Sequence, residues 1–308
     1  MSHLIFSLLP LLLLAACSKP GSADSKPANG PLRVVATTGM VGDLARQIGG
    51  NRIALITLMG PGVDPHLYKA TASDVSNLQQ ADVILYSGLH LEGRMADLLA
   101  SMQQAGRRVA AVTDAMPHER LISTDSASKA HDPHVWFDVA LWSETVGPVA
   151  DVLVAADPAH AAEYRERAAR AREQMLALDA WVRTTAATIP EDRRILVTSH
   201  DAFGYFGRAY GFQVVGLQGI STVTEAGLAD MAKLADYIRE RKVPAIFVES
   251  SVSHMTLERI SADTGARIGG ELFSDAMGTP GLIEDGYDVG TYEGMVRHNM
   301  NTVARALQ

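Results

Sequence analysis

The chain carries a dispersed set of three imidazoles and one carboxylate whose residue types suit a divalent metal ion. Two of the histidines end Asp-Pro-His triplets, the third ends a strand-like apolar run, and the aspartate follows another such run. These candidate ligands are His66, His134, His200 and Asp275. Zinc-finger ligands come in close pairs, whereas these four lie far apart in the sequence, so a folded scaffold has to bring them together. We therefore expect the metal to be cargo or cofactor rather than the element that folds the chain.

The chemistry of these four groups leaves the metal open. Imidazole suits zinc, copper, nickel and iron, while a carboxylate is shared by zinc and the harder manganese. Tetrahedral zinc accepts three histidines and one aspartate. Manganese accepts the same set if the aspartate binds through both oxygens or if water adds.

Three neighbouring residues are candidates for supporting the ligands. Asp64 and Asp132 each stand two residues before a candidate histidine. Each can orient the imidazole ring or form a turn with the proline that follows it, and we favour the turn. Trp136, with Phe137, is expected to line the site or to pack beneath it.

Glu249 is the strongest competitor of Asp275 for the carboxylate position, because it follows the apolar run 245–248. We favour a different role for Glu249, as a cap of the next helix, and keep orientation of a ligand as the alternative. His131 is a weaker extra ligand, which we assign to the loop before the second Asp-Pro-His triplet. His90 and His298 are interpreted as structural hydrogen-bonding residues near the cleft.

Short β-rich runs alternate with amphipathic runs, a pattern that predicts parallel βαβ units. The predicted strands are Leu32–Thr37, Ile53–Met59, Val83–Tyr86, Val109–Val112, Ile195–Thr198, Gln213–Val215, Ala245–Val248 and Glu271–Phe273. The predicted helices are Val41–Ile48, Ser73–Gln80, Leu91–Ala105, Phe203–Tyr210, Glu225–Arg241, His254–Thr264 and Thr291–Leu307. Most of the candidate ligands follow predicted strands, and open α/β sheets bind ligands beyond the carboxyl ends of their strands.

Residues 157–189 form a different kind of segment, without glycine and with proline only near its start. Pro158 fits the first position of a helix that Asp157 caps, and Pro190 ends the run. About thirty helical residues would reach roughly 45 Å. We predict an α/β fold of two lobes, residues 32–156 and 190–308, each a mainly parallel sheet flanked by helices and joined by this one long rigid helix. The division places two candidate ligands in each lobe, with one metal site between them.

The N-terminal residues carry the features of an exported lipoprotein. Residues 1–16 contain a short apolar run and end in a lipobox, which predicts a signal peptide cleaved before Cys17. Cys17 is the only cysteine, so it can carry a lipid but no intramolecular disulfide. Residues 17–31, rich in Ser, Gly, Pro, Lys and Ala, predict a flexible tether. We expect an extracytoplasmic protein, lipid-anchored to the cell membrane or in the periplasm.

Several stretches resemble those of the metal-binding solute-binding lipoproteins of ABC importers, the cluster A-I type that handles zinc and manganese. They are Gly62-Val-Asp-Pro-His-Leu-Tyr68 with Asp74, Asp132-Pro-His-Val-Trp-Phe-Asp138, Ser199-His-Asp-Ala-Phe-Gly-Tyr-Phe206, Ala209-Tyr-Gly211, Phe273-Ser-Asp-Ala-Met-Gly278 and Tyr292-Glu-Gly-Met-Val-Arg-His-Asn299. These stretches cover nearly the whole mature chain in the order of the family. The resemblance implies two α/β lobes joined by a rigid helix, with metal held by His66, His134, His200 and Asp275.

The chain departs from the family pattern at positions that bear on the choice of metal. The loop 117–131 lacks the His-rich acidic insertion that is common in zinc-specialised members. His200, however, stands where many manganese-specialised members have Glu. Lys69 and Ala70 replace an acidic residue and a proline that the family often has. Zinc and manganese therefore both remain candidates, with iron a distant third.

We predict a receptor that captures zinc or manganese and delivers it to an ABC permease and its ATPase, not an enzyme. We expect a monomer. We also expect no binding of nucleic acid, because the formal net charge is -8 and phosphate binding needs clustered Lys and Arg. The alternative is a secreted zinc metallohydrolase that uses the same three histidines, with Glu249 or Asp275 as general base. No His-Glu-x-x-His or Gly-x-Ser-x-Gly motif is present. An adhesin of the same fold is a third possibility, for which the sequence offers no adhesive feature.

Overall fold

Four parallel strands form the sheet of the first lobe. The computed structural model describes residues 30–124 and 130–308, so the predicted signal peptide, Cys17 and most of the tether lie outside the described residues. The strands are β1 (Leu32–Ala36), β2 (Ile53–Thr57), β3 (Val83–Tyr86) and β4 (Arg108–Ala111), in the order β2-β1-β3-β4 with every neighbouring pair parallel. The central strands β1 and β3 are largely buried, as their apolar runs predict for a sheet covered on both faces.

Three helices flank this sheet; two begin within two residues of the predicted start, and the third begins five residues later than predicted, after a 3₁₀ turn over 93–95. They are α1 (Gly39–Gly49), α2 (Ala72–Gln80) and α3 (Ala96–Gln104). Thr38 caps α1 by accepting a hydrogen bond from the backbone N–H of Val41. Thr71 and Asp74 form a reciprocal capping box at the start of α2. These caps fix where α1 and α2 begin.

Two elements of the first lobe were not predicted, α4 (Val139–Trp142) and α5 (Val146–Ala156). They belong to the one stretch of the described residues that has the length and composition of a membrane span, residues 139–156 with a mean hydropathy of 1.4. Half of this stretch is buried inside the protein, and α5 packs against α1 and α6. We therefore assign it to the core. A segment that is apolar all round has no amphipathic period from which to predict a helix.

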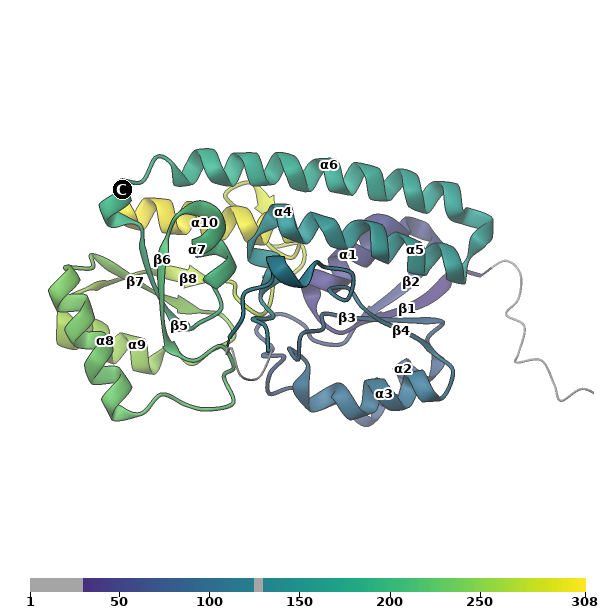
Figure 1. Cartoon of the computed structure of the whole chain (residues 1–308), viewed down its shortest axis with the longest axis horizontal. Coiled ribbons are helices and arrows are strands. Elements are labelled where there is room, and N and C mark those ends of the chain that lie inside the picture. The colour runs from purple at the N-terminus through teal and green to yellow at the C-terminus, as the bar shows by residue number, and fades with distance from the viewer. Residues whose placement is uncertain (1–29, 125–129) are drawn as a thin grey trace, which may run out of the picture. The chain divides into compact units, whose positions relative to one another are not determined.

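The long helix of the chain is α6 (Ala161–Ala186), 26 residues that extend roughly 39 Å. It begins later than predicted, because Pro158 starts a separate 3₁₀ turn over 158–160. The Asp157 carboxylate lies 2.7 Å from Nδ1 of His160 and accepts a hydrogen bond from the Tyr164 hydroxyl, and the 3₁₀ turn has no side-chain cap bond. α6 contacts α1 and α5 in the first lobe and α10 in the second, and it runs past both in Figure 1.

The second lobe repeats the parallel pattern. Its strands are β5 (Ile195–His200), β6 (Gln213–Gln218), β7 (Ala245–Glu249) and β8 (Arg267–Leu272). β5 pairs with β6 and β7 with β8, both in parallel, and β5 lies beside β7. Its helices are α7 (Gly204–Tyr210), α8 (Leu228–Arg241), α9 (Met255–Thr264) and α10 (Tyr292–Leu307). A small antiparallel hairpin, β9 (Ile283–Glu284) and β10 (Tyr287–Asp288), was not predicted.

One apolar cluster extends through both lobes. It contains Trp142 of α4, Tyr164 of α6, Phe247 of β7 and Tyr292 of α10, all of them buried. The fold is mixed α/β with parallel sheets flanked by helices and one long helix, as predicted. The shared core implies that the lobes are less independent than two separate domains would be.

Candidate metal centre

The four candidate ligands come together although the sequence separates them widely. His200 is the last residue of β5, and Asp275 follows the end of β8 by three residues. His66 lies on the loop after β2, and His134 directly precedes a 3₁₀ turn over 135–137. The second lobe thus supplies two ligands at or just after strand ends, as the rule for open α/β sheets predicts, whereas the first lobe supplies two from loops.

Asp275 occupies the centre of this cluster. Its Oδ1 lies 3.2 Å from Nε2 of His134, and its Oδ2 lies 3.3 Å from Nε2 of His200 and 3.6 Å from Nε2 of His66. Nε2 of His66 and Nε2 of His134 are 3.4 Å apart. All three imidazoles therefore present the same ring nitrogen to the carboxylate.

These separations have the size that a small divalent cation requires. Four ligand atoms about 2.1 Å from a central zinc ion form a tetrahedron whose edges measure roughly 3.4 Å. Four of the separations, three to an Asp275 oxygen and one between two imidazoles, are 3.2–3.6 Å, and all four ligand atoms lie within 4.8 Å of one another. Both carboxylate oxygens of Asp275 face imidazoles, so the geometry also accommodates a bidentate aspartate and a higher coordination number. The geometry fits a divalent metal without choosing between zinc and manganese.

Buried polar atoms without hydrogen-bond partners provide independent support for a cation. Both Asp275 oxygens and Nε2 of His200 are buried, and none of them has a hydrogen bond of good geometry; their polar neighbours are the other groups of the cluster. Leaving such atoms unsatisfied is costly, and native proteins rarely tolerate it. A cation between these atoms would satisfy all of them at once. Within residues 30–124 and 130–308, this is the only cluster of three or more His, Cys, Asp or Glu side chains with ligand atoms this close.

A second carboxylate stands behind each of two imidazoles. Oδ1 of Asp132 lies 2.7 Å from Nδ1 of His134 and also accepts the backbone N–H of that histidine. Asp132 therefore both forms the turn and contacts the ring. A carboxylate at Nδ1 fixes the ring orientation and leaves Nε2 free to bind a metal.

Glu249 lies behind His200 in the corresponding way. This contact corrects the role that we favoured for Glu249, a cap of the next helix. Its Oε2 lies 2.5 Å from Nδ1 of His200, and its Oε1 accepts the backbone N–H of His200. The side chain does not cap the next helix, because α9 begins with His254 as its N-cap residue and has no side-chain cap bond. Glu249 ends β7 beside the end of β5, so its side chain meets His200 first.

Asp64 supports its histidine in a different way. Its Oδ1 accepts the backbone N–H of His66 at 2.8 Å, which is the turn that we favoured. Its Oδ2 accepts a hydrogen bond from Thr222 at 2.5 Å. Thr222 belongs to the second lobe and was missed by the sequence analysis, because no local pattern marks a residue that meets a loop so far away in the chain.

Two side chains hold the segment that carries Asp275. The amide of Asn299 on α10 accepts the backbone N–H of Phe273 and donates to the carbonyl of the same residue. The indole Nε1 of Trp136 donates to the carbonyl of Ser274, and its ring lies 5.3 Å from that of His134. Trp136 therefore links a ligand of the first lobe to the ligand loop of the second. Asn299 was not identified from the sequence as a site residue.

The charges in the cluster shift the pKa values of the ligands. Burial alone would lower the pKa of His134, but Asp132 and Asp275 raise it to about 9. Burial likewise opposes a charged His200, but Glu249 and Asp275 raise its pKa well above the usual value. Burial would raise the pKa of Asp275, yet the two imidazoles hold it well below its usual range. Burial lowers the pKa of His66. Without metal, protons on His134 and His200 thus compensate the buried carboxylates.

The chain matches one known protein family over most of its length. The family described as "Zinc-uptake complex component A periplasmic" matches residues 34–306. The chain belongs to this family. The resemblance predicted from the sequence is thereby confirmed.

Relatives within the zinc-uptake family carry names that refer to two different metals. The zinc-binding protein TroA of Treponema pallidum is 48% identical over 94% of this chain and 92% of its own length. The manganese-binding lipoprotein MntA of Bacillus subtilis is 46% identical over 92% of both chains. The solved structure of the periplasmic zinc-binding protein TroA matches with a TM-score of 0.85 and 48% identity, over 90% of this chain and 99% of that one. Nearly equal identity to the two relatives leaves the metal undecided.

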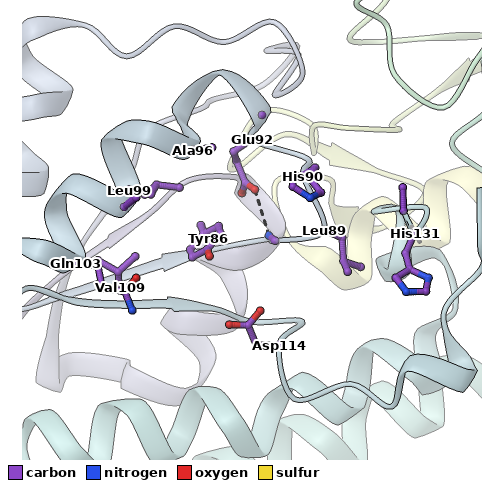
Figure 2. Close-up of a pocket in the computed structure, with 14 residues that line it drawn as sticks. Tyr86, Leu89, His90, Glu92, Ala96, Leu99, Gln103, Val109, Asp114 and His131 are labelled. Carbon is purple, nitrogen blue, oxygen red and sulfur yellow. Dashed lines mark hydrogen bonds between the residues drawn. The ribbon is translucent and has the colours of Figure 1, made fainter. Parts of the chain in front are cut away.

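A cavity of about 440 Å³ lies in the first lobe of this protein (Figure 2). None of the four candidate ligands lines it. His90 and His131 line it, so neither belongs to the cluster around Asp275. The buried Glu92 carboxylate at its wall accepts hydrogen bonds from Thr37 and from the backbone of residues 87 and 88. Its oxygens are therefore already satisfied within the protein. His298, in contrast, makes the structural contact predicted for it, with the carbonyl of residue 271.

Proposed function

We propose that this protein is an extracytoplasmic receptor that captures one zinc or manganese ion and delivers it to an ABC permease for import. The observation that carries the proposal is the convergence of three Nε2 atoms on the buried carboxylate of Asp275. The names of the relatives, a zinc-binding protein and a manganese-binding lipoprotein, support the same cargo.

We assign the metal-ligand role to His66, His134, His200 and Asp275. Asp132 and Glu249 would hold two of the rings, because a carboxylate at Nδ1 raises the basicity of the imidazole that it contacts. The metal would replace protons on His134 and His200, because only neutral imidazole binds a metal.

A role in transport fits this site better than hydrolysis. A catalytic zinc ion usually keeps one coordination position open for water, whereas four protein side chains converge here. The family is named for metal uptake, and no relative reported above is named as a hydrolase. We therefore infer that the protein is not an enzyme.

We infer that Cys17 carries a lipid that anchors the protein and that residues 17–31 form the tether. The relative from Bacillus subtilis is named a lipoprotein, which supports this anchor. The permease would act with its ATPase, and we propose that the receptor works as a monomer. The long helix α6, packed against elements of both lobes, would act as a rigid connection between residues 32–156 and 190–308.

Metal content tests the proposed function directly. The purified protein is stripped of metal, offered equimolar zinc and manganese, and assayed by mass spectrometry. We expect one equivalent of metal, lost in His66→Ala and Asp275→Ala but retained in His131→Ala, whose histidine lies outside the cluster. Absence of stoichiometric metal in the unmodified protein would refute the proposal.

A further inference from the structure

We propose that Thr222 is a positioning residue that latches the loop carrying His66 and thereby controls how long the metal is retained. This inference rests on the proposed function. The latch consists of the Thr222 hydroxyl, the Asp64 carboxylate and the backbone of His66. One carboxylate thus connects a residue of the second lobe to a ligand of the first.

The two carboxylate oxygens of Asp64 accept different hydrogen bonds. Oδ2 accepts the Thr222 hydroxyl at 2.5 Å, and Oδ1 accepts the backbone N–H of His66 at 2.8 Å. Hydrogen bonds to an ionised carboxylate are stronger than those between neutral groups. Because both bonds end on the same rigid group, a shift of Thr222 would be transmitted to the backbone of His66.

The burial pattern indicates that Thr222 has a specific role in its segment. Residues 219–227 connect β6 to α8 without helix or strand, and Thr222 is the only buried residue among them, 7% exposed. The next residue, Val223, is 55% exposed. The other residues of this connection are exposed or only partly buried, so the Thr222 hydroxyl and its partner Asp64 form the buried polar anchor of the connection.

The loop of the first lobe approaches the second lobe at another point as well. Gly62 adopts φ +71°, and a Cβ added there would lie 3.5 Å from the carbonyl oxygen of Ser250. The left-handed conformation favours glycine at this position. The loop from Gly60 to His66 therefore lies against the second lobe at Gly62 and is hydrogen-bonded to it at Asp64.

His66 is the ligand whose position depends most on such a latch. The rings of His134 and His200 are backed by Asp132 and Glu249, and their side chains are fully buried. The His66 side chain is 4% exposed and is held through its backbone by Asp64. The ligand with the least support and the most solvent access is the one expected to leave the metal first. Loss of the latch should therefore speed metal release.

The experiment measures the rate at which loaded protein transfers its metal to an excess of chelator. Thr222→Val removes the hydroxyl with little change in shape, Thr222→Ser retains it, and Thr224→Val makes the same change at an exposed position of the same segment. We expect release from Thr222→Val to be roughly tenfold faster or more. Thr222→Ser and Thr224→Val should release metal at close to the unmodified rate.

A double-mutant cycle separates the latch from a general loss of stability. Asp64→Ala should also speed release, and adding Thr222→Val to Asp64→Ala should have little further effect, because the bond is already absent. The metal-free protein with Thr222→Val should still unfold cooperatively, with an unfolding temperature lower by no more than a few degrees, as expected for the loss of one hydrogen bond. Unmodified release from Thr222→Val, or additive effects in the cycle, would overturn the latch. If the unmodified protein bound no metal, the proposed function would fail instead.

Discussion

The Asp275 carboxylate, which follows β8 of the second lobe, lies 3.2 Å from the imidazole of His134 in the first lobe. Both side chains are fully buried. Trp136, two residues after His134, also donates a hydrogen bond to the carbonyl next to Asp275. The candidate metal site therefore lies where the two lobes meet, with a buried carboxylate of one lobe against an imidazole of the other.

Replacement of His66 tests whether the metal is cargo. His66→Ala should lower metal affinity by orders of magnitude, since it removes one of the four proposed ligands. The metal-free variant should still unfold cooperatively at close to the unmodified temperature, because the shared apolar core does not depend on this side chain. Calorimetric titration measures the affinity, and a thermal melt measures the folding. Loss of cooperative unfolding in the unmodified protein once metal is removed would show that the metal has a structural role.

Glu249→Gln tests the contact behind His200. The substitution keeps the shape and an acceptor for the backbone N–H of His200 but removes the charge at Nδ1. We expect a loss of affinity of about 10–100-fold, as for other residues that orient a metal ligand. Glu240→Gln, at an exposed position of α8, serves as the control and should have no effect. Equal affinities in titrations of the two variants would argue that Glu249 is structural only.

Metal affinity should rise with pH across the neutral range. Burial disfavours a proton on His134, but its carboxylate neighbours raise its pKa to about 9, and the pKa of His200 is also raised. Below pH 9 the proton on His134 must leave before the metal binds. Each released proton contributes up to tenfold in affinity per pH unit, so two protons would contribute up to about a hundredfold.

Competition titrations between pH 6 and pH 10 measure this dependence. The curve should flatten once the pH exceeds the raised pKa values. Asp275 should not contribute in this range, because the imidazoles keep its pKa well below 3.8. An affinity that is independent of pH would contradict protonated imidazoles in the metal-free site.

The packing of α6 leads to a prediction about conformational change. α6 contacts α1 and α5 of the first lobe and α10 of the second, and one apolar cluster extends through both lobes. Metal release should therefore involve a modest rearrangement rather than wide opening. Small-angle scattering of metal-free and loaded protein should give closely similar profiles. A difference as large as that of binding proteins with a flexible hinge would show that α6 is not a rigid connection.

Much of the fold could be predicted because its signals are local. Buried parallel strands such as β3 read as short apolar runs, and capping residues such as Thr71 mark where helices begin. α4 and α5 were missed because their side chains are apolar in nearly every direction, so tertiary burial rather than periodicity explains them.

The candidate ligands were recognisable in the sequence because each carries its own motif or follows a strand, and parallel strands direct such residues to one edge of a sheet. The supporting contacts were not recognisable. Glu249 was assigned to the wrong task and Thr222 was not noticed, because their partners, His200 and Asp64, are distant in the chain. The sequence by itself determined which side chains can bind a metal. Only the tertiary structure decided which carboxylate reaches which ring, since that depends on how two strand ends and two loops pack together.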